Sequence, residues 1–409
     1  MKADWEETTL GDIAEVKGGK RVPKGYQLQL EPTKYPYITV SDFSDDGTID
    51  VSGLRYVSHD VFEQIKRYTI SSNDLYLSIA GTIGKTGRVP PQLDGASLTE
   101  NACKLVLHPG IDRDFVYYFT KSDDFTTQAG TNTRTAAQPK LALQRLKTIK
   151  LRIPTSIAEQ QRIVTLLDEA FDCIATAKAN AEKNLQNARA IFEGHLQSVF
   201  TQRGGGWVEH KLKSLTTKIG SGATPRGGGE SYKSEGISLI RSLNVHDLGF
   251  KYAKLAFLDN AQAEELSNVK VQSRDVLLNI TGASVARCTI APDDVLPARV
   301  NQHVSIIRPI VEKLDANFLH YLLISKPYKE RLLKTGEEGG STRQAITKAQ
   351  IQEFSVTLPA SLEEQKAICD KLAVMLTETQ HLEAVYKQKL TALDKLKKSL
   401  LHRAFTGDL

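Results

Sequence analysis

The chain has 409 residues, of which 40% are hydrophobic and 25% charged, so its composition is that of a globular protein with room for two or three domains. A net charge of +5, from 53 Lys and Arg against 48 Asp and Glu, permits a polyanionic partner without requiring one. No apolar run approaches the roughly 20 residues that span a bilayer, and the four separated cysteines follow no secretory signal. We therefore expect a cytoplasmic protein with reduced thiols and no membrane association.

Similar segments recur in the sequence about 200 residues apart. Such an internal repeat decides the architecture of the whole chain, so it comes before the individual elements. Pro154 corresponds to Pro359 at a shift of 205, whereas Trp5 corresponds to Trp207 at a shift of 202. Such a drift indicates short insertions and deletions, which loops tolerate better than packed elements do. The pattern predicts one framework written twice, with loops that have diverged.

Each repeat begins with a tryptophan and a Gly-containing turn, followed by short apolar segments between Gly, Asp and Ser, as is typical of β-strands. These strands are predicted at 35–43, 74–81 and 101–109, and again at 237–245, 275–282 and 301–309. A helix with matching aromatic residues follows, FVYYF from Phe115 and FLHYL from Phe318. The mixture predicts an α+β domain of roughly 150 residues in each repeat.

A long helix is predicted after each of these domains, because apolar residues then recur at intervals of three or four. In the first repeat the predicted seam is Ile163, Leu167, Ala170, Ile174, Ala177, Ala181, Leu185, Ala188, Phe192, Leu196 and Val199. In the second it is Ile368, Leu372, Met375, Thr379, Leu382, Tyr386, Leu390, Leu393, Leu396 and Leu400. A helix of about 44 residues is longer than one that covers a single domain, so we predict that the two helices pair. The alternative is that each helix covers only its own domain.

Sequence motifs of catalysis are missing. The segment GTIGKTG from Gly81 ends like a phosphate-binding loop, but the first glycine of that motif is replaced by Ile79. The nine histidines show no metal-ligand spacing, and no nucleophile elbow is found. We predict no catalytic residue, no cofactor and no metal site in this chain, although an enzyme with an unrecognised site is an open alternative.

The layout resembles the specificity (S) subunit of type I restriction–modification systems. The resemblance covers essentially the whole chain and is carried by the P-x-x-x-x-E-Q phrase at 154–160 and 359–365 and by GGSTRQAITKAQIQEFSVTLPASLEEQKAI. It implies an α+β fold with two globular target recognition domains, residues 1–154 and 204–359. These alternate with a central helix, 155–203, and a C-terminal helix, 360–409. The helices would pair as an antiparallel coiled coil within an internal pseudo-twofold repeat.

The resemblance also implies a function. The chain would be a non-catalytic subunit that recognises an asymmetric bipartite target in double-stranded DNA and docks two methyltransferase (M) subunits on its helices. Restriction (R) subunits would join through the complex. The active sites, and with them S-adenosylmethionine, ATP and Mg, would belong to the partner subunits of a restriction-competent or methylation-only system. The alternative is a coiled-coil scaffold whose globular domains bind a non-DNA partner and show no salt-dependent affinity for DNA.

DNA contacts are expected from Lys and Arg near phosphates and from polar side chains near base edges, in the loops where the two repeats differ. In the first repeat the candidates are Lys20, Arg21, Lys24, Ser78, Thr82, Lys85, Asn132, Arg134 and Gln138. In the second they are Arg226, Arg241, Asn244, Asn279, Thr281, Ser284, Arg287, Asn301, Gln302, His303, Arg343 and Gln344. Asn301 matches Asn101 at a shift of 200, and such a matched pair is more typical of turn caps than of base contacts.

Overall fold

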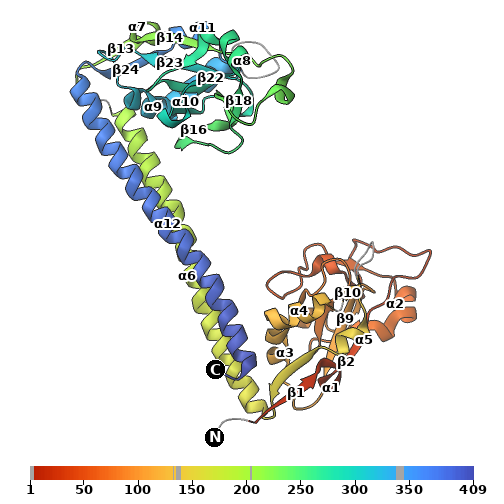
Figure 1. The fold of residues 1–409 in the computed structure, drawn as a ribbon. Helices are drawn as coiled ribbons and strands as arrows, with labels where there is room; N and C mark the ends of the chain where they lie inside the picture. Colours follow the sequence, from red (N-terminus) through yellow and green to blue (C-terminus); the bar gives the residue numbers. More distant parts are fainter. Residues whose placement is uncertain (1–3, 132, 135–139, 203–204, 338–344) are drawn as a thin grey trace. The chain divides into compact units, whose positions relative to one another are not determined.

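The chain forms two compact units, residues 1–182 with 388–409 and residues 183–387. The computed structural model describes residues 4–131, 133–134, 140–202, 205–337 and 345–409. Each unit holds one globular domain and parts of two long helices, α6 (Ile157–Thr201) and α12 (Leu362–Thr406) (Figure 1). Both helices begin and end within three residues of their predicted bounds, 155–203 and 360–409. Because the compact units divide both helices, the four-part division of the chain stays a prediction.

The globular domain of the first unit is built on two small sheets with the strand orders β2-β9-β6-β7 and β4-β3-β8-β5. Neighbouring strands are antiparallel except β3 and β8. The strands are β1 (Trp5–Thr9), β2 (Ala14–Gly18), β3 (Pro36–Ile38), β4 (Arg55–Tyr56), β5 (Thr69–Ile70), β6 (Leu75–Ser78), β7 (Thr86–Arg88), β8 (Ala96–Leu98), β9 (Ala102–Leu107), β10 (Thr133–Arg134), β11 (Lys140–Leu141) and β12 (Lys150–Pro154). The short helices are α1 (Leu10–Ile13), α2 (His59–Ile65), α3 (Arg113–Thr120), α4 (Asp123–Thr131) and α5 (Leu143–Lys147).

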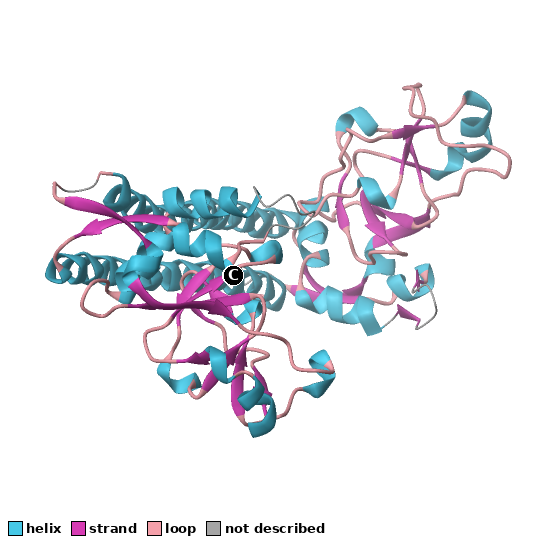
Figure 2. Ribbon diagram, turned by 90° about the horizontal axis from the view of Figure 1, so that it is seen from above, coloured by secondary structure: helices cyan, strands magenta, loops and turns pink. Residues whose placement is uncertain are grey.

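The second unit repeats this topology, with sheets β14-β23-β20-β21 and β18-β15-β22-β19 and one parallel pair, β15 with β22. The strands are β13 (Trp207–Lys211), β14 (Thr216–Ser221), β15 (Ile237–Ile240), β16 (Val245–His246), β17 (Gly249–Phe250), β18 (Ala256–Leu258), β19 (Lys270–Val271), β20 (Val276–Asn279), β21 (Cys288–Ile290), β22 (Ala298–Val300), β23 (Val304–Pro309) and β24 (Ser355–Pro359). The short helices are α7 (Leu212–Leu215), α8 (Asn260–Glu265), α9 (Ala316–Ile324), α10 (Lys326–Glu337) and α11 (Lys348–Glu353). Figure 2 shows the strands gathered in the globular domains and absent from the long helices. The predicted strands and aromatic helices are confirmed as β3, β6, β9, β15, β20, β23, α3 and α9.

Strand pairing fixes which residues of the two units correspond. Ser78 pairs with Ala102 between β6 and β9, and Asn279 pairs with Val304 between β20 and β23. Ala102 and Val304 are 202 residues apart, so residues in the loops that lead into β9 and β23 correspond to one another at a shift of 202.

The predicted match between Asn101 and Asn301 was therefore wrong by two residues. Asn101 corresponds to His303, since their carbonyl groups accept the equivalent hydrogen bonds from the chain that leaves β6 and β20. Asn301 corresponds to Thr99. Matching the two asparagines by residue identity gives the wrong correspondence, because equivalent strand positions are defined by hydrogen-bond register and not by residue type.

The main hydrophobic core of each unit includes side chains from both long helices. In the first unit these include Ile163 and Leu167 from α6 and Leu401 and Phe405 from α12. In the second unit they include Leu196 and Phe200 from α6 and Cys369 and Leu372 from α12. Each domain is thus sealed by the start of the helix that follows it and by the end of the other helix.

The two long helices run antiparallel in both units. In the first unit Lys178 of α6 pairs with Asp394 of α12 at 2.7 Å, and in the second Arg189 pairs with Glu383 at 3.2 Å. Residue numbers thus rise along α6 as they fall along α12. The antiparallel pairing that the resemblance implied is confirmed.

The predicted seam of α12 was wrong at two positions. Leu382 and Leu396 are 40% and 47% exposed, whereas Glu383 is half-buried and accepts ion pairs from Arg189 and Lys387. The apolar rule missed this because a polar side chain can occupy a seam when the facing helix supplies its partner.

The repeated Glu-Gln phrase forms a joint between domain and helix. Gln160 is buried at the start of α6, where its side-chain oxygen accepts a hydrogen bond from the main chain of Asp112, the N-cap of α3, at 2.7 Å. Its side-chain nitrogen donates to the carbonyl of Pro154, the last residue of β12, at 2.9 Å. Gln365 makes the same two bonds in the second unit at 2.9 and 3.1 Å. One amide thereby ties a strand end and two helix starts together.

Candidate nucleic-acid interface

A polar groove of about 680 Å³ lies where the loops of the first domain converge. We call it groove 1, and its lining residues are Arg21, Val40, Ser41, Ala80, Gly81, Thr82, Lys85, Glu100, Asn101 and Lys140. They come from the loops that follow β2, β3, β6 and β8 and from the start of β11. Three of them are cationic and one is anionic, so the groove favours a polyanion.

The carboxylate of Glu100 is fixed inside groove 1. It accepts a hydrogen bond from Nε of Arg21 at 2.6 Å and another from Oγ1 of Thr99 at 3.0 Å. Burial alone raises the pKa of Glu100, but the bonds from Arg21 and Thr99 outweigh it, so the pKa lies below its ordinary value. The side chain is therefore an ionised hydrogen-bond acceptor at neutral pH.

The loop between β6 and β7 forms one wall of groove 1 and carries the glycine-rich segment. The buried hydroxyl of Ser78 donates to the carbonyl of Thr82 and accepts from the main-chain N–H of Lys85 at 2.9 Å, which closes the loop. Gly81 and Gly84 have φ values of +74° and +91°, a region that favours glycine. The segment is thus a hairpin turn that presents Thr82 and Lys85 to the groove.

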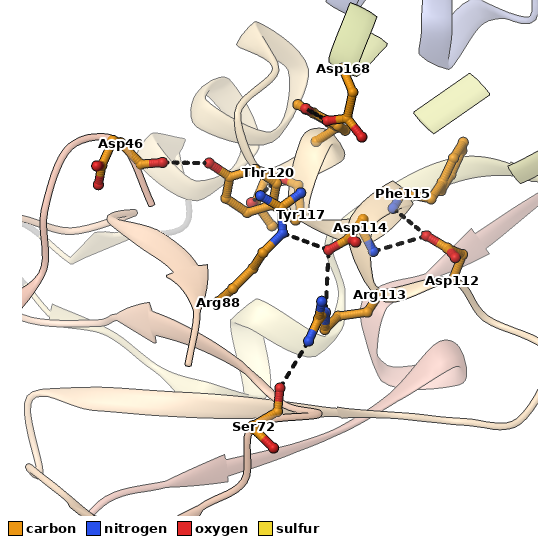
Figure 3. A network of polar contacts seen from close by, with 11 residues as sticks. Asp46, Ser72, Arg88, Asp112, Arg113, Asp114, Phe115, Tyr117, Thr120 and Asp168 are labelled. Carbon is orange, nitrogen blue, oxygen red and sulfur yellow. Dashed lines mark hydrogen bonds and ion pairs between the residues drawn. The ribbon is translucent and has the colours of Figure 1, made fainter. Parts of the chain in front are cut away.

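A network of polar contacts surrounds the start of α3 (Figure 3). Arg88 lies between Tyr117 and Asp114, with Nε 2.6 Å from the carboxylate and the guanidinium carbon 4.2 Å from the ring centroid. The Tyr117 hydroxyl donates to the carbonyl of Asp46 at 3.1 Å, and the residue before Asp46 pairs with Lys85. Burial raises the pKa of Asp114, but the guanidinium bonds outweigh it and bring the pKa below its ordinary value. The Tyr117 hydroxyl thus joins α3 to the loop of Asp46, and the neighbouring Asp45 pairs with Lys85 of groove 1.

The second unit builds the equivalent loops with different side chains. We call this group loop cluster 2, and it consists of Thr224, Thr281, Gln302 and His303. The hydroxyl of Thr224 donates to the side-chain oxygen of Gln302, whose nitrogen lies 3.1 Å from Nε2 of His303. Nδ1 of His303 meets the hydroxyl of Thr281. Hydrogen bonds thus connect four polar side chains in a row.

The structure leaves twelve of the predicted DNA-contacting side chains at least partly accessible. They are Lys20, Arg21, Lys24, Thr82, Lys85, Arg226, Arg241, Thr281, Ser284, Arg287, Gln302 and His303. Groove 1 brings together Arg21, Thr82 and Lys85 in one unit, and loop cluster 2 brings together Thr281, Gln302 and His303 in the other. Direct DNA contact by these residues stays a prediction.

Four predicted contact residues have buried side chains, which cannot meet a base in this conformation. They are Ser78, Asn244, Asn279 and Asn301. Asn244 donates to the carbonyl of Lys251 at 2.8 Å, Asn279 to that of Ser242 at 2.9 Å, and Asn301 accepts from the main chain of His303 at 3.1 Å. They shape the loops instead, because a buried amide has to satisfy its own polar groups.

The remaining candidates, Asn132, Gln138, Arg343, Gln344 and the side chain of Arg134, lie outside the described residues. Conversely, the sequence prediction missed Glu100, Lys140 and Thr224. The predicted contacts were cations and neutral polar residues, and a carboxylate such as that of Glu100 was not among these residue types. The shift of 202 from strand pairing is the signal that identifies it as the counterpart of Gln302.

Within the described ranges, no three His, Cys, Asp or Glu side chains come together to hold a metal ion. None of the described helices is long and apolar enough to cross a membrane. The features that recur in both units are polar loop clusters on an α+β frame, and together they define a duplicated binding protein.

Comparison with known proteins names the class. The family profile described as type I restriction modification DNA specificity domain matches residues 2–187 and 205–392. The chain therefore belongs to the specificity-subunit family of type I restriction–modification systems, whose members are generally non-catalytic.

Individual relatives match over most or half of the chain. The MjaVIII specificity subunit of Methanocaldococcus jannaschii is 24% identical over 434 aligned residues, which cover 99% of this chain and 93% of the relative. The EcoBI specificity subunit of Escherichia coli is 27% identical over 209 residues, which cover 49% of this chain and 41% of the relative.

Solved structures share the fold. A chain from a structure on complex assembly and conformational transition of the type I R-M system superposes with a TM-score of 0.78 at 19% identity, covering 100% of both chains. The HsdS subunit from Thermoanaerobacter tengcongensis superposes with a TM-score of 0.65 at 20% identity, covering 99% of this chain and 97% of the other.

Proposed function

We propose that each domain of this specificity subunit recognises one half of an asymmetric, bipartite target in double-stranded DNA. The observation that carries the proposal is that register-equivalent loops hold unlike polar side chains, Glu100 in groove 1 and Gln302 in loop cluster 2. Like frameworks with unlike side chains present different hydrogen-bonding patterns, so the two half-sites differ in sequence.

Affinity comes from the cations around the two loop groups. Lys20, Lys24 and Arg226 are exposed, as is Arg21, whose side chain is 77% accessible. Such side chains bind phosphates and release counterions, which makes binding depend on salt without specifying sequence. The polar side chains inside the groups then supply the discrimination between bases.

The long helices serve as the docking surface for two M subunits, with R subunits joining through the complex. Ile191 of α6 and Leu396 of α12 hold equivalent helix positions, at the same shift of 205 as the two prolines, and are 55% and 47% exposed. One apolar surface offered twice fits two identical partners. The catalytic sites for methylation and cleavage, with S-adenosylmethionine, ATP and Mg, lie in those partners. The chain works with them on double-stranded DNA in the cytoplasm.

The test is reconstitution of the chain with an M subunit of its family, followed by mapping of methylated sites. We expect one bipartite motif with two unlike halves, together with a DNA affinity that falls steeply with added salt. Methylation at random sites would refute recognition of a bipartite target. DNA affinity that is independent of salt would favour the scaffold with a non-DNA partner.

Docking is tested by Ile191→Asp and Leu396→Asp. Each charge placed on an apolar contact is expected to weaken one M-subunit contact by about 2 kcal/mol, roughly 30-fold, so each variant loses one M subunit and the double variant loses both. Native mass spectrometry gives the stoichiometry.

Val311→Asp is the matched control, since Val311 is an exposed valine outside the long helices. A double variant that still binds two M subunits would place the docking surface elsewhere.

A further inference from the structure

Glu100 and Gln302 occupy the same place in the two domains. Each lies two residues beyond the end of a central strand, β8 at Leu98 and β22 at Val300, and two residues before the next strand, β9 or β23. The strand register makes them equivalent, although the surrounding loops have diverged.

Both side chains are held in place by a neighbouring loop. Arg21 fixes Glu100 at 2.6 Å, and the residue in the corresponding loop of the second domain, Thr224, fixes Gln302 by a hydroxyl hydrogen bond. Each therefore meets a ligand with little loss of side-chain entropy, as a specificity-determining group requires.

The chemistry of the two groups differs in one respect. An ionised carboxylate only accepts hydrogen bonds, whereas a primary amide both donates and accepts. Glu100 lies among the cations Arg21, Lys85 and Lys140, and its carboxylate, which repels phosphate, suits a base amino group as the DNA partner. In the major groove the cytosine amino group is a donor that suits Glu, and adenine presents the adjacent donor and acceptor that suit Gln.

We propose that this position determines specificity, with Glu100 selecting cytosine in one half-site and Gln302 selecting adenine in the other. The inference rests on the proposed function, because it assigns a role within the recognition of a bipartite DNA target. Arg21 and Thr224 act as positioning residues that orient the two groups.

Reciprocal substitution tests the assignment in the reconstituted complex, with methylation measured on plasmid libraries randomised in each half-site. Glu100→Gln is expected to shift the preference at one position of one half-site from cytosine to adenine by about 10-fold or more. Gln302→Glu is expected to shift one position of the other half-site from adenine to cytosine by a similar factor. Each variant leaves the other half-site unchanged, so that half-site is an internal control for folding and docking.

Glu100→Ala and Gln302→Ala provide a second measurement, in which discrimination at the same position is lost while the remaining motif is kept. Unchanged base preference in the reciprocal variants would overturn the assignment, as would lower methylation with no new preferred base. Those outcomes are distinct from failure of the proposed function, in which the unsubstituted chain itself directs no defined motif.

Discussion

Phe200→Ala is expected to lower the free energy of unfolding of the second unit by about 3–5 kcal/mol, the range for removing a large side chain from a core. Phe200 is 1% exposed near the end of α6, and its ring lies 5.5 Å from Phe318 and 6.2 Å from Trp207 between centroids. The cavity cannot close easily, because these rings pack edge-on around it and belong to different elements.

Phe405→Ala is the matched change in the first unit, where the ring lies 5.1 Å from Phe115 and 5.5 Å from Phe119. The two tryptophans separate the measurements, because Trp5 packs in the first core and Trp207 in the second. Denaturant titrations of Trp5→Phe and Trp207→Phe backgrounds therefore follow one unit at a time.

Leu396→Ala is the control on α12, because an exposed leucine contributes little to the core, and its effect is expected to stay below about 1 kcal/mol. A loss of that small size in Phe200→Ala or Phe405→Ala would show that the distant helix end does not seal the domain.

Gln365→Ala is expected to cost about 3–5 kcal/mol in the second unit. The side chain is fully buried and accepts from the main chain of Asp315 at 2.9 Å while donating to the carbonyls of Pro359 and Lys313 at 3.1 Å each. Its removal leaves two buried main-chain groups, those of Asp315 and Pro359, without partners, and each such group costs about 1–3 kcal/mol when water cannot reach it. Denaturant titration followed through Trp207 measures the change.

Gln365→Glu is the matched variant of equal size. Its carboxylate still accepts from Asp315 but no longer donates to the two carbonyls, and it buries an unpaired charge beside them. We therefore expect a loss at neutral pH at least as large as that of Gln365→Ala. Gln160→Ala repeats the test in the first unit. A change below about 1 kcal/mol in Gln365→Ala would mean that the joint reorganises and that the repeated Glu-Gln phrase serves another purpose.

The prediction of helix ends and strands succeeded because the signals are local. The long helices begin just beyond Pro154 and Pro359, since proline ends a ladder and the following apolar spacing of three and four residues favours a helix. The prediction of the seam was wrong at Leu382 and Leu396 because the signal that decides it is not local. Which face of a helix meets its partner depends on the partner, and the ion pair of Glu383 with Arg189 is not visible in the spacing of apolar residues.

The candidate site shows the same division. Loops rich in Lys, Arg, Asn and Gln were identifiable from composition, but burial reassigned Ser78 and Asn279 to loop closure, and strand register identified Glu100 as the counterpart of Gln302. An asparagine or glutamine that shapes a turn and one that contacts a base look the same in the sequence. Only their accessibility separates them.

The sequence by itself determined that one α+β framework occurs twice, that a long helix follows each copy, and that the layout resembles a type I specificity subunit. These features follow from periodicity and proline positions, which are local signals, and from sequence segments that are repeated in the chain. The tertiary structure alone decided that Glu100 and Gln302 hold equivalent positions and that Phe405 completes the core of the first unit. Those relations join residues far apart in the chain, and hydrogen-bond register and packing, which no local pattern encodes, establish them.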